Sequence, residues 1–138
     1  IDGLPKALQQ QMHDAEELMK HNTGVKFNVA ANYGGQDELV RAMQAIAAES
    51  INGKLQAADI NEAVIEEHLD TKGNLPVDLM IRTSGDVRVS NFLLWQAAYA
   101  EFWFTDTNWP DFTPECFVDA ILDYAKRDRR FGGLNNSK

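Results

Sequence analysis

The spacing of apolar residues changes along this chain from the period of a helix to the period of a strand and back. Residues 5–22 repeat apolar positions at spacings of four, three and four, which predicts an amphipathic helix with Pro5 in its first turn. The stripe consists of Leu8, Met12, Ala15 and Met19. Residues 25–33 instead alternate between apolar and polar side chains up to Gly34 and Gly35, which predicts a strand.

Helical spacing returns after the two glycines. The apolar positions of residues 39–47 predict a second helix, and Asn52 with Gly53 predicts its end. Asp59 followed by Glu62 has the pattern of a capping box, so we expect Asp59 to begin a short third helix.

The rest of the chain repeats the succession of strand and helix. Residues 77–82 alternate again and predict a second strand, and Thr113 with Pro114 predicts the start of a last helix that ends before Gly132 and Gly133. Strands that alternate with helices of this length predict an α/β fold with a largely parallel sheet flanked by helices, here as a single domain over residues 1–138.

Composition restricts the class of protein. The 138 residues are 44% hydrophobic and carry 21 acidic against 13 basic side chains, a net charge of -8, which excludes a disordered chain and argues against nucleic acid as a partner. Cys116 is the single cysteine and cannot form an internal disulfide, so we expect a reducing, cytoplasmic setting. The chain opens at Ile1 without a methionine, which suggests processing or a piece of a longer protein.

A candidate anion site follows the second predicted strand. Arg82 ends that strand, Gly85 allows a tight turn, Arg88 follows, and Ser90 is placed to cap a helix that starts near Asn91. Two guanidinium groups, a hydroxyl and free helix amides favour phosphate or diphosphate. The spacing is equally compatible with two surface arginines, one of them paired with Asp86.

Three acidic residues are candidate Mg²⁺ ligands, although each taken singly is more often a solvated surface group. They are Glu101, Asp106 and Asp111. The histidines, His13, His21 and His68, are scattered and are expected to be structural or exposed, and Cys116 is expected to pack without reacting. A dense aromatic run over residues 92–109 is expected to be mostly core, or else an apolar wall for a lipid-like tail.

Residues 78–112 contain the motif RTSGD-x-R-x-SNFLLWQ followed by AYAE, F-TD and WPDF, and RRFGG follows near the C-terminus. Together with the segment Asn32-Tyr33-Gly34-Gly35, these motifs resemble the C-terminal half of the cis-prenyltransferases, the undecaprenyl diphosphate synthase family. The resemblance extends from about Ile1 to Gly133.

The resemblance implies specific roles. Arg82, Arg88, Val89 and Ser90 would bind the diphosphate of isopentenyl diphosphate, and Glu101 would bind Mg²⁺. The segment Arg130-Phe131-Gly132 would reach across a homodimer towards the active site of the partner, with Arg130 and Gly132 as its substrate-binding residues. The family adds isopentenyl diphosphate to an allylic diphosphate such as farnesyl diphosphate, and in bacteria its product is the carrier lipid for cell-wall peptidoglycan, which implies contact with a membrane surface on release.

Some features of the family are missing. Its N-terminal half carries an HxxDGNxRWA-type signature with the catalytic Asp, and no such signature occurs in these 138 residues. We therefore expect no catalytic residue in this chain and an inactive fragment. Asp86 stands where the family usually has Glu, and Gln36 stands where Arg often follows the glycines.

Two other classes of protein compete with this interpretation. A non-catalytic subunit of a two-component cis-prenyltransferase would not need Arg82, Arg88, Ser90 and Glu101, so their presence favours the catalytic lineage. A nucleotide-binding domain is disfavoured because neither of the usual glycine-rich phosphate loops occurs in the sequence.

Overall fold

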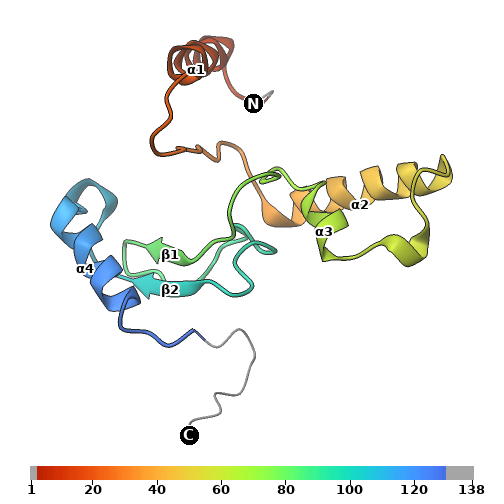
Figure 1. Ribbon diagram of the computed structural model, residues 1–138. Coiled ribbons are helices and arrows are strands. Elements are labelled where there is room, and N and C mark those ends of the chain that lie inside the picture. Colours follow the sequence, from red (N-terminus) through yellow and green to blue (C-terminus); the bar gives the residue numbers. More distant parts are fainter. Residues whose placement is uncertain (1–2, 130–138) are drawn as a thin grey trace, which may run out of the picture.

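The structure is a computed structural model that describes residues 3–129; this part of the chain holds a two-stranded parallel sheet with the last helix against it, and the N-terminal helix lies apart (Figure 1). Strand β1 (Leu79–Arg82) pairs with β2 (Glu101–Phe104) so that Leu79 lies opposite Glu101 and Arg82 lies opposite Phe104. The predicted α/β fold with a parallel sheet is confirmed. Because parallel strands end at the same edge, the loops that follow β1 and β2 lie side by side.

Four of the five predicted helices are present. They are α1 (Lys6–Met19), α2 (Gly35–Ile51), α3 (Glu62–Glu66) and α4 (Pro114–Tyr124), with short 3₁₀ turns at η1 (Ala57–Asp59) and η2 (Trp109–Asp111). Helix α4 begins as expected, because the Thr113 side chain accepts a hydrogen bond from the backbone N–H of Cys116. Helix α3 lies against α2, and α4 lies against β2.

The predicted cap of the third helix was wrong by two residues. Asp59 ends the 3₁₀ turn η1, and the cap of α3 is Asn61, whose Oδ1 accepts the N–H of Val64 at 3.1 Å. The reason is that Asn61 has the extended backbone of an N-cap, with φ -139 and ψ -178, so that Glu62 becomes the first helical residue.

Helix α1 and the segment after it are largely uncovered. No residue of α1 is buried, and Leu8 in its predicted stripe is 42% exposed. Residues 25–31 form neither helix nor strand, and Val25 and Phe27 are 94% and 79% exposed. The predicted strand was therefore wrong, because alternation defines an apolar face but a strand also needs a hydrogen-bonded neighbour, and none pairs with this segment within residues 3–129.

Strand β2 is the element that sequence spacing missed. Its residues 102–104 are three aromatic side chains in succession, which show no alternation, and all four residues of β2 are half-buried. A strand covered on both faces has no period-two pattern and resembles a buried helix segment in sequence.

The helix expected after Ser90 does not form. Ser90, Asn91 and Leu93 have φ values of 47°, 62° and 48°, and residues 90–99 make a series of turns between β1 and β2. These φ values lie in the left-handed region, which a right-handed helix cannot contain. The prediction that Ser90 caps a helix was therefore wrong.

The core of the described residues is small. Its buried apolar members are Ala42, Ile46, Leu69, Met80, Ala97 and Ala120, and Glu38 is the charged residue buried with them. Across residues 3–129 the structure shows no helix that is both long and apolar enough to cross a bilayer.

Candidate functional site

Two arginines meet at the carboxyl end of β1. The Nη2 atoms of Arg82 and Arg88 each lie 2.8 Å from the same atom, Oδ2 of Asp86. The Arg82 side chain is 27% exposed, whereas that of Arg88 is 64% exposed. The sequence left open whether one arginine would pair with Asp86, and the structure pairs both. The two guanidinium groups therefore converge on one point at the rim of the sheet.

The turn that brings them together is held by the loop after β2. The N–H of Ser84 donates to the carbonyl of Thr107, and the N–H of Gly85 donates to that of Thr105, both at 2.9 Å. Gly85 has φ 72°, and a Cβ there would lie 3.1 Å from Oδ1 of Asp106. Position 85 therefore requires glycine both for its backbone and for the close approach of Asp106.

Glu101 lies at the other end of the sheet. Its partner in the sheet, Leu79, lies three residues before Arg82, which is about 10 Å along the strand. Its Oε2 accepts a hydrogen bond from Nη1 of Arg127 at 2.9 Å, and Arg127 also binds Asp123 and the carbonyl of Phe102. The hydrogen bonds to Asp123 and then to Glu101 raise the pKa of Arg127. Glu101 is thus part of an ion-pair cluster that is separate from the arginine pair.

The candidate metal ligands are not brought together. Asp106 lies beside Gly85, Asp111 ends η2, and Glu101 lies at the start of β2. Among residues 3–129, no group of three or more His, Cys, Asp or Glu side chains could hold a metal ion. The three candidate acids are therefore separate groups among the described residues.

The histidines and the cysteine lie outside this site. His68 hydrogen-bonds the carbonyl of Val64 at 2.7 Å, which raises its pKa, and it lies 3.4 Å from Glu49. His13 lies 3.4 Å from Glu16, and His21 is exposed. Cys116 is half-buried at the start of α4.

Residues 90–92 form a turn in place of the helix start whose free amides were expected to bind an anion. Ser90 is exposed, and the N–H of Phe92 donates to the carbonyl of Val89 at 3.0 Å, which closes a turn around Ser90 and Asn91. Asn91 then caps α2 from outside that helix: its carbonyl accepts the N–H of Gly35 at 2.7 Å, and its Oδ1 accepts the N–H of Gln36 at 2.8 Å. These first amides of α2 are therefore already bound to protein.

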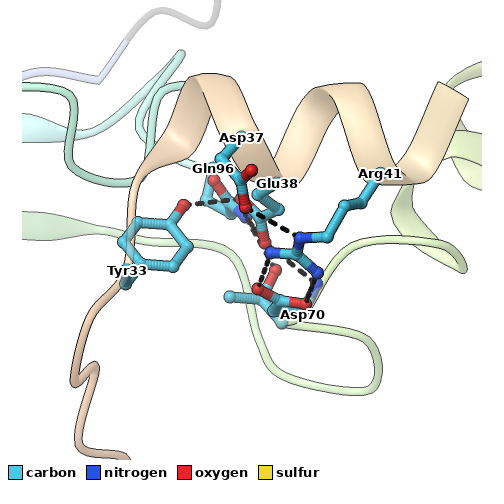
Figure 2. Close-up of polar contacts among 7 residues, drawn as sticks. Tyr33, Asp37, Glu38, Arg41, Asp70 and Gln96 are labelled. Atoms are coloured by element: carbon cyan, nitrogen blue, oxygen red, sulfur yellow. Dashed lines mark hydrogen bonds and ion pairs between the residues drawn. The ribbon is translucent and has the colours of Figure 1, made fainter. Parts of the chain in front are cut away.

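A buried carboxylate below this turn was not found from the sequence. Glu38 is 1% exposed and accepts hydrogen bonds from the Tyr33 hydroxyl at 2.5 Å, from Nε2 of Gln96 at 3.0 Å and from the N–H of Asp70 at 2.9 Å. Figure 2 shows these groups gathered around the first turn of α2. Burial raises the pKa of Tyr33, and the hydrogen bond to Glu38 raises it further. Only its nearness to the Asn32–Gly35 segment could have drawn attention to Glu38, because an acid in the first turn of a helix is common.

Arg41 encloses this cluster on the solvent side. Its Nη1 and Nη2 donate to the two carboxylate oxygens of Asp70 at 2.8 and 2.7 Å, and its Nε donates to Asp37 at 2.9 Å. The hydrogen bonds to Asp70 and then to Asp37 raise the pKa of Arg41, and the same pair lowers the pKa of Asp70. The bidentate contact fixes the loop after α3 to α2 (Figure 2).

The aromatic run divides into separate groups. Phe92 packs edge-to-face on Tyr33 with ring centroids 5.7 Å apart, whereas Phe102 stacks on Phe104 within β2. Trp109, Tyr99 and Phe92 are 72%, 65% and 41% exposed, and the other aromatic residues of the run are half-buried, so the expectation of a mostly buried run was wrong. A cleft of about 750 Å³ has a lining that includes Leu69, Leu75, Leu94, Trp95 and Tyr99.

Arg130 and Gly132, the two predicted substrate-binding residues near the C-terminus, lie outside the described residues.

Sequence comparisons cover nearly the whole chain. The family model described as "Putative undecaprenyl diphosphate synthase" matches residues 1–132. A protein of Pasteurella multocida named ditrans,polycis-undecaprenyl-diphosphate synthase ((2E,6E)-farnesyl-diphosphate specific) is 48% identical over 133 residues, which are 96% of this chain and 55% of that protein. An isoprenyl transferase of Bacillus anthracis is 47% identical over 133 residues, 96% of this chain and 52% of that protein. The chain therefore spans about half the length of the curated relatives it matches.

Solved structures agree with this match. Lavandulyl diphosphate synthase from Lavandula x intermedia, solved in complex with dimethylallyl diphosphate, superposes with a TM-score of 0.90 at 42% identity, over 94% of this chain and 56% of that chain. A probable undecaprenyl diphosphate synthase from Campylobacter jejuni superposes with a TM-score of 0.78 at 36% identity, over 94% of this chain and 58% of that chain.

The contact between Arg41 and Asp70 generates a prediction about acid stability. Because Arg41 lowers the pKa of Asp70 below its ordinary 3.8, the pair stabilises the fold above that pH and loses its effect as the pH falls through the lowered value. Arg41→Met should therefore lower the free energy of unfolding at neutral pH by about 1 kcal/mol or less, since both side chains are nearly half exposed. Urea unfolding from neutral pH into the acid range measures this difference, with Arg41→Lys as the charge-preserving control. A difference that persists unchanged in acid would contradict the assignment.

Proposed function

Because the chain belongs to the undecaprenyl diphosphate synthase family of cis-prenyltransferases, we propose that the complete protein condenses isopentenyl diphosphate with an allylic, farnesyl-type diphosphate. Within that protein, this chain holds the half that binds isopentenyl diphosphate. The substrate-binding residues of the proposal are Arg82, Arg88, Val89 and Ser90. The product is a polyprenyl diphosphate, the carrier lipid for bacterial cell-wall synthesis.

One observation carries this proposal: the guanidinium groups of Arg82 and Arg88 share a single oxygen of Asp86. Both donors lie 2.8 Å from that atom, so the two Nη2 atoms cannot be further apart than twice that distance, which is within the span of one diphosphate. Charge-assisted hydrogen bonds of this kind contribute about 1.5–3 kcal/mol each. A diphosphate offers more negative charge and more acceptor oxygens than the single carboxylate it would displace.

The proposed role of the arginines is to position the substrate. Loss of diphosphate from the allylic substrate leaves a carbocation, and the alkene of isopentenyl diphosphate attacks it and then loses a proton. Holding the second diphosphate at the rim of the sheet fixes where that alkene lies, which lowers the entropic part of the barrier. The cleft whose lining includes Leu94 and Trp95 lies against the turns that follow Ser90, and its apolar side chains offer a surface for the growing prenyl chain.

A magnesium ion is part of the proposal, but the described residues supply at most one of its ligands. Mg²⁺ usually takes one or two carboxylates together with phosphate oxygens of the substrate. Glu101 is the candidate, and one of its oxygens already binds Arg127 at 2.9 Å. The remaining ligands would come from the diphosphates and from residues outside this chain.

The proposed assembly is a cytoplasmic homodimer that contacts a membrane surface when its product leaves. Arg130 and Gly132 would reach the active site of the partner. The residues just before Arg130 are held at the starts of the two strands, which supports this idea. Arg127 binds Glu101, and Arg129 binds Asp78. That segment is thus fixed at the opposite end of the sheet from Arg82.

The first prediction from the proposed function concerns the chain alone. We expect the purified 138-residue chain to show no prenyl transfer, because it spans about half of its relatives and leaves the apolar segment 25–31 uncovered. The measurement is incorporation of labelled isopentenyl diphosphate with farnesyl diphosphate as the acceptor. Turnover by this chain would refute the proposal that the rest of the protein is needed.

The second prediction concerns Arg88 in the complete protein. Arg88→Ala should raise the KM for isopentenyl diphosphate by about tenfold or more, the loss expected for one charge-assisted hydrogen bond. The KM for the allylic diphosphate should change much less. Steady-state kinetics with each substrate varied in turn measures the two effects. Equal effects on both substrates would count against the assigned role.

The third prediction concerns Glu101. If Glu101 is a metal ligand, Glu101→Gln should raise the Mg²⁺ concentration needed for half-maximal activity, because a neutral amide is a weaker ligand than a carboxylate. Arg127→Met is the matched control, since it removes the same ion pair but keeps the carboxylate. Metal titration of both variants separates the two roles. An unchanged titration for Glu101→Gln would remove Glu101 from the metal site.

A further inference from the structure

The turn that carries Ser90 is strained. Three residues within four, Ser90, Asn91 and Leu93, have positive φ values of 47°, 62° and 48°, and none of them is glycine. The first two are the central residues of the turn closed by Phe92 and Val89, in the pattern of a type I′ turn. Asn tolerates this backbone, but Ser and Leu do so poorly. Such a turn persists only where the surrounding structure holds it.

The structure that holds it begins with the two glycines before α2. Gly35 donates its N–H to the carbonyl of Asn91 at 2.7 Å. A Cβ on Gly35 would lie 2.9 Å from Cγ of Leu94 and 3.1 Å from the Asn91 carbonyl oxygen, and a Cβ on Gly34 would lie 2.9 Å from Nδ2 of Asn91. The backbone of the turn therefore packs directly on Gly35, and the Asn91 side chain packs on Gly34.

The Glu38 cluster holds the same turn from its far side. Gln96, three residues after Leu93, donates to both oxygens of Glu38 at 3.1 and 3.0 Å. Tyr33 donates its hydroxyl to Glu38 and packs its ring on Phe92. Figure 2 shows Tyr33 and Gln96 converging on Glu38. Because Glu38 is 1% exposed, these bonds are shielded from water and keep their strength.

We propose that residues 33–38 are the positioning element of the diphosphate site: they hold the Ser90–Leu93 turn in its strained conformation and so fix the backbone of Ser90, two residues after Arg88. The inference rests on the proposed function, since it takes the ligand of Ser90 to be a diphosphate. It assigns a positioning role to Tyr33, Gly34, Gly35 and Glu38, which are not proposed to bind the substrate. They act on the substrate only through the turn.

The test uses two matched pairs of variants in the complete enzyme. Gly35→Ala introduces a Cβ into the Asn91 and Leu94 contacts, whereas Gly24→Ala introduces one where nothing lies within 4 Å. Glu38→Gln weakens the buried cluster, whereas Glu49→Gln makes the same change near the other end of α2, where the side chain is half-buried and lies 3.4 Å from His68. A double variant, Glu38→Gln with Gln96→Glu, exchanges donor and acceptor and should restore the contact.

Two measurements are made on each variant. The first is the KM for isopentenyl diphosphate beside the KM for the allylic diphosphate, and the second is calorimetric binding of inorganic diphosphate. We expect Gly35→Ala to raise the first KM and weaken diphosphate binding by about tenfold to a hundredfold, as a misplacement near 1 Å does. The KM for the allylic diphosphate should change by no more than about twofold, well below the effect expected for isopentenyl diphosphate. Glu38→Gln should act in the same direction, and the exchanged double variant should recover.

Each other outcome has a defined meaning. If Gly35→Ala and Glu38→Gln melt at lower temperature and raise both KM values equally, their role is structural and the inference fails. Unchanged isopentenyl diphosphate kinetics in folded variants would also overturn it. If the wild-type enzyme binds inorganic diphosphate but forms no prenyl product, the proposed function fails, and the diphosphate titration of the variants still decides the inference.

Discussion

The structure around the candidate site depends on one buried carboxylate. Glu38 lies at the start of α2 with almost no exposure, and it joins three parts of the chain by hydrogen bonds from Tyr33, Asp70 and Gln96. A buried charge without partners would cost several kcal/mol, so these donors offset the cost of burying Glu38 while they join α2 to the turns after β1. These turns also contain Ser90, and three of their residues have positive φ values, which residues other than glycine rarely adopt.

The sequence could predict the elements whose signals are local. Helical spacing located the helices, and Thr113 located the start of α4, because caps and stripes depend on neighbours a few residues away. The strand at residues 25–33 failed because pairing depends on a distant partner. Strand β2 and the turns after Ser90 failed for a related reason. Aromatic residues and Leu suit several backbones equally, and the contacts of Gly35 and Glu38 decide among them.

The candidate site was predictable in its residue types but not in its geometry. The arginines at the end of β1 could be found because strand ends in parallel sheets collect functional side chains. That both would bind the same oxygen of Asp86 depends on the turn at Gly85, which the loop after β2 fixes. Sequence spacing could not show where Glu101 lies relative to the two arginines. The register of β1 and β2 shows that it lies at the opposite end of the sheet from Arg82.

These 138 residues carry a net charge of -8, which repels anions, so the proposed diphosphate would have to be bound through local organisation. At physiological salt, exposed charges beyond about 8 Å are largely screened, so the arrangement within the first few ångströms decides the affinity. Asp86 has two opposing effects here. It competes with the ligand for both guanidinium groups, and it also keeps Arg82 and Arg88 together, so that less side-chain entropy is lost when an anion replaces it. The length of the Asp86 side chain therefore sets both the competition and the spacing of the two cations.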